Sequence, residues 1–88
     1  MRLIKVAAAV LNTTPLAWDA NRKAIVDAIH EARRQQVAIL CLPELCITGY
    51  GCEDAFLSSG TQAMAQKLLL ELVPETQGMA VSFGLPLL

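Results

Sequence analysis

Two apolar runs separated by an amphipathic stretch mark the first half of the chain. Residues 3–10 are rich in Val, Ile and Ala, and so short an apolar run predicts a buried strand rather than a helix. Residues 37–42 are apolar without alternation, which is typical of a strand buried on both faces in a parallel sheet. Cys41 lies in this second run, so we expect it to be a core side chain.

The stretch between these runs has the apolar period of a helix. Over residues 19–36, apolar side chains at one-turn spacing form a single stripe, made of Ile25, Ala28, Ile29 and Ala32. We expect the Asp19 carboxylate to cap the start of this helix. A strand, a helix and a strand in this order imply a right-handed crossover between parallel strands.

The second half of the chain predicts another helix and a third strand. Ser59 and Gln62 have the spacing of a capping box at a helix start. The apolar face behind it consists of Met64, Leu68 and Leu72. We expect Pro74 to end this helix, residues 52–57 to form a helical turn, and residues 79–85 to form a strand.

The apolar content is high for a domain of this size. Of 88 residues, 55% are hydrophobic and 17% are charged, whereas an ordinary globular domain has about 25% charged residues. Small domains have proportionally more surface to cover, so this composition suits the inner layers of something larger. Because the chain also ends in an apolar stretch, we expect residues 1–88 to open a larger α/β domain. The alternative is a small module that completes its core by oligomerising.

Charge and cysteine usage exclude several classes of protein. The formal net charge is −1, so the chain has no excess of basic residues with which to bind nucleic acid or an anionic membrane surface. No apolar run approaches the roughly 20 residues of a membrane-spanning helix. The three cysteines, Cys41, Cys46 and Cys52, are spaced unlike zinc ligands or a disulfide framework. We therefore expect no metal site and a cytoplasmic location.

The loop at residues 43–51 is the best candidate for chemistry, because ligands of open α/β sheets bind beyond the carboxyl ends of parallel strands. Glu44 follows the second predicted strand, where a carboxylate can serve as a general base. An exposed loop glutamate is the alternative. Cys46 lies two residues further on as a possible nucleophile. No His or Lys activator is near it in sequence, so we expect a buried packing residue instead.

Residues 42–54 resemble the catalytic-glutamate segment of the carbon–nitrogen hydrolase (nitrilase) superfamily. They carry the pattern P-E-L-x-x-T-G-Y after an apolar strand, followed by Gly-Cys-Glu-Asp. The likeness covers essentially all 88 residues, because the first strand, the helix bearing Asn21, this loop and the closing G-L-P-L occur in the family's order. The extension at residues 51–54 is most similar to the amino-terminal glutaminase domains of glutamine-dependent NAD(+) synthetases.

This resemblance implies a four-layer α-β-β-α sandwich, of which residues 1–88 would form the first β-α-β-α-β section. It also implies a Glu-Lys-Cys catalytic set in which Glu44 is the general base that activates a cysteine thiol toward the side-chain amide of glutamine. Tyr50 matches a tyrosine that would help to shape the glutamine-binding pocket, or it simply packs on the core. The family's lysine and cysteine motifs do not occur in this chain, so we expect it to have no glutaminase activity alone.

The resemblance further implies partners for the chain. These are the remainder of the hydrolase domain and a synthetase domain that uses ATP and magnesium to amidate deamido-NAD, in an enzyme expected to be a homo-oligomer. No cofactor is expected in this chain itself. The alternatives are a non-enzymatic truncated hydrolase module that oligomerises or binds a partner, and a different amidase of the same superfamily.

Four further predictions concern single residues. We expect His30 to be a surface or boundary residue and Asn21 to cap or pack near the start of the first helix. Gly49 and Gly51 should be turn residues with positive φ. The acidic pair Glu53 and Asp54 should begin the helical turn, or else contact a neighbouring domain or subunit.

Overall fold

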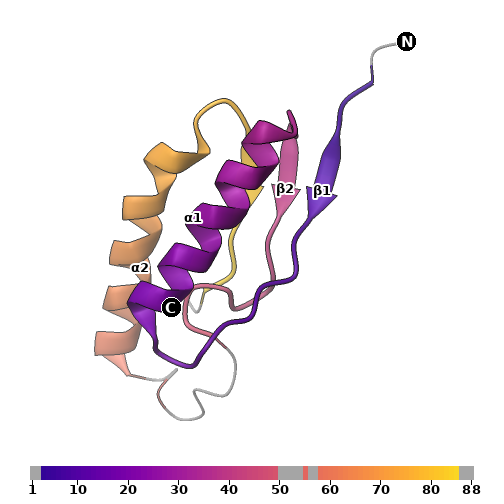
Figure 1. The fold of residues 1–88 in the computed structure, drawn as a ribbon. Coiled ribbons are helices and arrows are strands. Elements are labelled where there is room, and N and C mark those ends of the chain that lie inside the picture. Colours follow the sequence, from indigo (N-terminus) through magenta and orange to yellow (C-terminus); the bar gives the residue numbers. More distant parts are fainter. Residues whose placement is uncertain (1–2, 50–54, 56–57, 86–88) are drawn as a thin grey trace.

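The computed structural model describes residues 3–49, 55 and 58–85, in which three parallel strands carry helices on one face (Figure 1). Strands β1 (Val6–Ala8), β2 (Ile39–Cys41) and β3 (Ala80–Ser82) lie in the spatial order β1-β2-β3. Leu40 at the centre of β2 pairs with Ala7 of β1 and Val81 of β3. The predicted parallel sheet is confirmed, and each strand is shorter than its apolar run.

Helix α1 (Trp18–Arg34) forms from the predicted amphipathic stretch. Ile25, Ile29 and Ala32 of its apolar stripe are buried, and Ala28 beside them is half-buried. The prediction that Asp19 caps the helix is wrong, because the cap residue is Ala17 and Asp19 lies within the first turn. A backbone turn, in which the Ala17 amide donates to the Thr14 carbonyl at 3.1 Å, starts the helix earlier than the carboxylate would.

Helix α2 (Ser59–Leu72) continues into the short 3-10 helix η2 (Val73–Thr76). The cap is Ser58 rather than Ser59: its hydroxyl oxygen accepts from the Thr61 amide at 3.5 Å. The predicted capping box is thus wrong by one residue, and Gln62 is buried on the core side of the helix. The predicted apolar face is confirmed at Leu68 and Leu72, and Pro74 stands at the start of η2.

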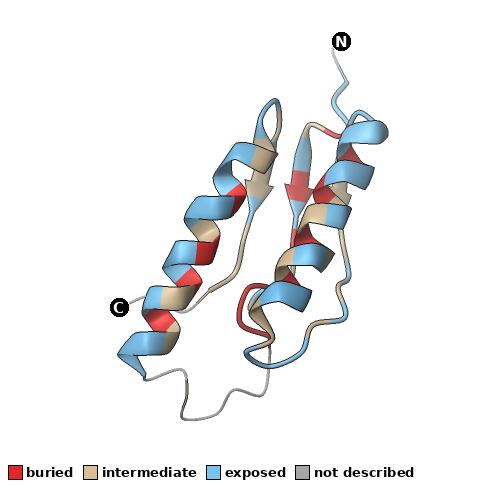
Figure 2. Ribbon diagram, turned by 60° about the vertical axis from the view of Figure 1, so that its left-hand side comes forward, coloured by how far each residue is buried: buried red, intermediate tan, exposed pale blue. Residues whose placement is uncertain are grey.

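The core lies between the helices and one face of the sheet (Figure 2). Leu40 points into this core and is 2% exposed, whereas its neighbour Ile39 is 38% exposed and Cys41 is exposed. The expectations that β2 is buried on both faces and that Cys41 is a core residue are therefore wrong for the described residues. Both helices cover the same face, which leaves Val6, Ile39 and Cys41 on the open one.

Several predictions fall on residues outside the described ones. Of the helical turn predicted at 52–57, only Ala55 is described, and Tyr50, Gly51, Glu53 and Asp54 lie outside the described residues. Within the described part of the chain, no helix has the length and apolar character needed to cross a membrane.

Candidate active site

Glu44 lies at the carboxyl edge of the sheet, three residues beyond the end of β2. It begins a turn over residues 44–48, named here the Glu44 turn. Its side chain is exposed, whereas Cys46, Ile47 and Thr48 of the same turn are fully buried. The turn therefore anchors itself in the core by its second half and presents the carboxylate at the sheet edge where α/β proteins bind ligands.

Asn21 ties the Glu44 turn to the loop that follows β1. Its side-chain oxygen accepts from the Thr14 amide at 3.0 Å, and its Nδ2 donates to the carbonyls of Thr14 at 2.9 Å and Ile47 at 3.2 Å. Asn21 is 1% exposed, so these hydrogen bonds are protected from water. The prediction of local capping or packing is confirmed, and the contact with Ile47 extends it across 26 residues of sequence.

Gly49 brings the end of the Glu44 turn against the same loop. Its φ is +81°, which confirms the predicted left-handed conformation, and its amide donates to the Leu45 carbonyl at 2.7 Å. A Cβ at this position would lie 2.7 Å from the Thr14 carbonyl oxygen. Only glycine therefore satisfies both the backbone conformation and the close approach of the two loops.

On its other side the Glu44 turn contacts the segment that follows β3. The Ile47 amide donates to the Gly84 carbonyl at 3.3 Å. Just before the turn, the Leu42 amide donates to the carbonyl of Ser82, the last residue of β3, at 3.2 Å. A Cβ at Gly84 would lie 2.7 Å from the Leu45 nitrogen and closer still to the Glu44 carbonyl group. Sequence reasoning assigned no role to Gly84. The available signal was a glycine after an apolar strand, which often marks the close approach of another backbone.

Cys46 is a buried packing residue, as predicted. Its side chain is 0% exposed, and its Sγ accepts from the Gly84 amide at 3.5 Å. Burial raises the pKa of the Cys46 thiol above its ordinary value, because a thiolate would lose its hydration. The neutral thiol is a poor nucleophile, so Glu44 is the candidate residue for chemistry at this edge.

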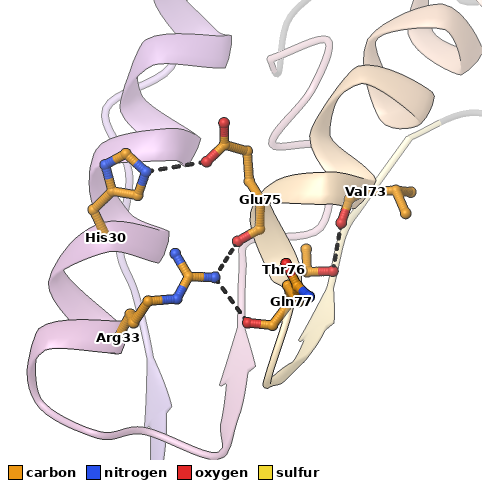
Figure 3. Close-up of polar contacts among 6 residues, drawn as sticks. All are labelled: His30, Arg33, Val73, Glu75, Thr76 and Gln77. Carbon is orange, nitrogen blue, oxygen red and sulfur yellow. Dashed lines mark hydrogen bonds and ion pairs between the residues drawn. The ribbon is translucent and has the colours of Figure 1, made fainter.

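His30 lies on the surface, as predicted, in the carboxyl-terminal half of α1, and its side chain faces Glu75 of η2 (Figure 3). Its Nε2 is 3.1 Å from a carboxylate oxygen of Glu75 in η2. The neighbouring Arg33 donates from Nη2 to the backbone carbonyls of Glu75 and, at 3.0 Å, Gln77. These contacts join α1 to η2 and take no part in the candidate site.

The described residues include no group of three or more His, Cys, Asp and Glu side chains that could hold a metal ion. The resemblance implies magnesium and ATP for the synthetase domain and not for this chain.

Comparison with known proteins identifies the family to which this chain belongs. The family model of carbon–nitrogen hydrolases matches residues 5–87, so the chain belongs to that family. Its relatives include the glutamine-dependent NAD(+) synthetases of Arabidopsis thaliana, 40% identical over 90 residues, and Oryza sativa subsp. indica, 37% identical. The alignments cover 100% of this chain and 12% of each relative, so the chain spans about an eighth of their length.

A solved structure confirms the fold class. The glutamine-dependent NAD(+) synthetase of Cytophaga hutchinsonii matches with a TM-score of 0.95 and 47% sequence identity, over 97% of this chain and 15% of that one. The β-α-β-α-β arrangement described here is therefore a section of a nitrilase-like α/β domain. The assignments of Glu44 as catalytic and Tyr50 as substrate-binding remain predictions.

Proposed function

We propose that these residues belong to a glutamine amidohydrolase domain in which Glu44 is the general base. The observation that carries the proposal is the position of Glu44, exposed at the carboxyl edge of a parallel sheet on a turn fixed from both sides. Membership of the carbon–nitrogen hydrolase family supports the reaction class. The names of the relatives support glutamine as the amide substrate.

In the proposed reaction, Glu44 takes the proton from the thiol of a cysteine supplied by the rest of the domain. The thiolate attacks the side-chain carbonyl carbon of glutamine while a lysine stabilises the oxyanion. The protonated Glu44 gives this proton to the leaving nitrogen, so that ammonia departs, the Glu44 carboxylate is regenerated and a thioester remains. Glu44 then deprotonates a water molecule that hydrolyses the thioester to glutamate and free thiol. Since the cysteine and lysine motifs are not in this chain, residues 1–88 alone are expected to be inactive.

We propose that the released ammonia is used as a substrate within the same enzyme. Because the relatives are named as NAD(+) synthetases, we expect a synthetase domain to use it for the ATP- and magnesium-dependent amidation of deamido-NAD. A cytoplasmic homo-oligomer is part of the same proposal. Tyr50 is the proposed residue of this chain that shapes the glutamine pocket.

The test replaces Glu44 by glutamine in the full-length protein that carries these residues. Glutamine-dependent NAD formation should be abolished, whereas formation from added ammonia should persist, because ammonia bypasses the hydrolase. Glu71→Gln, the same substitution at an exposed position of α2, should leave both activities intact. Survival of both activities in Glu44→Gln would show that Glu44 is not the base.

A second candidate function rests on the open face of the sheet. Val6 is 61% exposed and Ile39 is 38% exposed there, and uncovered apolar sheet surface favours association. A non-enzymatic module would use this face to oligomerise. Sedimentation of the 88-residue chain distinguishes the candidates: a soluble oligomer of fixed stoichiometry favours the module, and aggregation favours a section of a larger domain.

A further inference from the structure

The backbone at Gly84 lies directly against the peptide that joins Glu44 to Leu45. A Cβ at Gly84 would stand 2.7 Å from the Leu45 nitrogen, and the Glu44 carbonyl carbon and oxygen would be nearer. The atoms that would have to give way are backbone atoms, which are not free to rotate aside. Any side chain at residue 84 would therefore push on the backbone that carries the candidate base.

Other described glycines lack this constraint. A Cβ at Gly60 in α2 would meet only the Ser58 hydroxyl oxygen, at 3.5 Å, and a Cβ at Gly78 would meet nothing within 4 Å. Gly49 is constrained, but by the loop after β1 rather than by Glu44. The contact at Gly84 is thus specific to the residue proposed to do the chemistry.

The side chain of Cys46, in the Glu44 turn, also contacts the backbone of Gly84. Its Sγ accepts from the Gly84 amide at 3.5 Å and lies 3.9 Å from the Gly84 carbonyl oxygen. The Ile47 amide donates to that same carbonyl at 3.3 Å. The sulfur sits two residues after Glu44 and is fully buried, so it connects the turn to the segment after β3 where water cannot compete.

We propose that Gly84 and Cys46 are positioning residues that set the backbone, and through it the carboxylate direction, of Glu44. The inference rests on the proposed role of Glu44 as the base. Proton transfer requires the carboxylate to lie within hydrogen-bond reach of the thiol, and a displacement of about 1 Å can cost about 100-fold in rate. The segment after β3 would thereby control a reaction in which none of its own side chains takes part.

The first test is Gly84→Ala in the full-length protein, assayed for glutamine hydrolysis and for NAD formation from ammonia. We expect kcat for glutamine hydrolysis to fall by about 100-fold. KM for glutamine should change little, and the ammonia-dependent activity should persist. Gly60→Ala is the matched control, and it should retain the kcat of the unsubstituted protein.

Cys46 gives a second test that does not depend on the tolerance of Gly84 to substitution. Cys46→Ala removes the hydrogen-bond acceptor for the Gly84 amide and should lower kcat for glutamine hydrolysis by about 10-fold, the equivalent of one net hydrogen bond. Cys46→Ser returns an acceptor and should recover part of that loss. If Cys46 merely filled apolar space, the buried serine hydroxyl would add a desolvation cost, and Cys46→Ser should be no better than Cys46→Ala.

Glu44→Gln in the same assays separates the two proposals. If it hydrolyses glutamine normally, the proposed function fails. If it is inactive while Gly84→Ala and Cys46→Ala both retain the full kcat, Glu44 is the base and the positioning role is overturned. If Gly84→Ala does not fold, the comparison of Cys46→Ala with Cys46→Ser decides. A higher kcat in Cys46→Ser than in Cys46→Ala supports the proposal, and equal losses of kcat in the two variants contradict it.

Discussion

The segments at the two opposite ends of the sheet are held in place by different kinds of contact. At the carboxyl edge of the sheet, the Glu44 turn is fixed by buried groups and backbone approach, through Asn21, Gly49 and Gly84. At the opposite end, α1 meets η2 through the exposed side chains of Arg33 and His30 (Figure 3). The end that carries the candidate base is thus the one built from buried hydrogen bonds and from glycines whose replacement would force a side chain against backbone.

The difference has an energetic basis. A buried amide or carbonyl left without a partner costs about 1–3 kcal/mol, and a Cβ forced against backbone has nowhere to move. Exposed ion pairs contribute only about 0–1 kcal/mol, because water and salt screen them. Substitutions at the Glu44 edge should therefore cost more than substitutions at the η2 end.

The largest loss in the free energy of unfolding is expected for a substitution at Gly49. Gly49→Ala combines the left-handed strain of about 1–2 kcal/mol with the overlap on the Thr14 carbonyl, so the free energy of unfolding should fall by about 3 kcal/mol or more. Gly78→Ala is the control, since it has a similar φ of +87° but open space around the new Cβ. Urea denaturation measures both. Equal losses would mean that the close approach to Thr14 contributes nothing.

A smaller loss is expected at Asn21. Asn21→Ala removes three hydrogen bonds and leaves the Thr14 and Ile47 backbone groups short of partners, which should lower the free energy of unfolding by about 2–3 kcal/mol. Asn12→Ala, at an exposed position of the same loop, should change it by less than about 0.5 kcal/mol. Comparable effects of the two substitutions would contradict the role given to Asn21.

Substitutions at the η2 end should lower the free energy of unfolding by less. Arg33→Ala removes the donor to the carbonyls of Glu75 and Gln77, and exposure limits the expected loss to about 1 kcal/mol. Arg34→Ala removes only an exposed contact with Glu31 on the same helix and should cost less than about 0.5 kcal/mol. A loss at Arg33 as large as that at Asn21 would remove the contrast between the two ends.

The elements of both ends could be predicted from the sequence, but not the contacts that distinguish them. Apolar periodicity located the strands and helices because it reflects which side chains face the core. The helix caps were displaced by one or two residues, at Asp19 and Ser59, because neighbouring backbone geometry selects the cap. Cys41 was misplaced because a continuous apolar strand does not reveal that both helices cover the same face. The role of Gly84 depends on a segment 40 residues away from Glu44 in sequence, which local patterns do not contain.

The smallest effect expected is a pH dependence that originates at Cys46. Burial raises the pKa of this thiol in the folded chain, whereas an unfolded cysteine titrates near about 8.5. Below that pH both states keep the proton, and the contribution to stability is fully present. Above it the unfolded state loses its proton first, so stability falls as the pH rises toward the folded pKa.

Urea midpoints of the wild-type chain and of Cys46→Ala, measured at pH 7.5 and pH 10, isolate this contribution. The wild-type chain should lose more stability over that interval than Cys46→Ala. Cys41→Ala is the matched control, because Cys41 is exposed and this variant removes a thiol without removing the buried one. If removing either cysteine altered the pH dependence equally, Cys46 would be as accessible to water as Cys41. The Glu44 edge would then lack the dry interior on which its contrast with the η2 end depends.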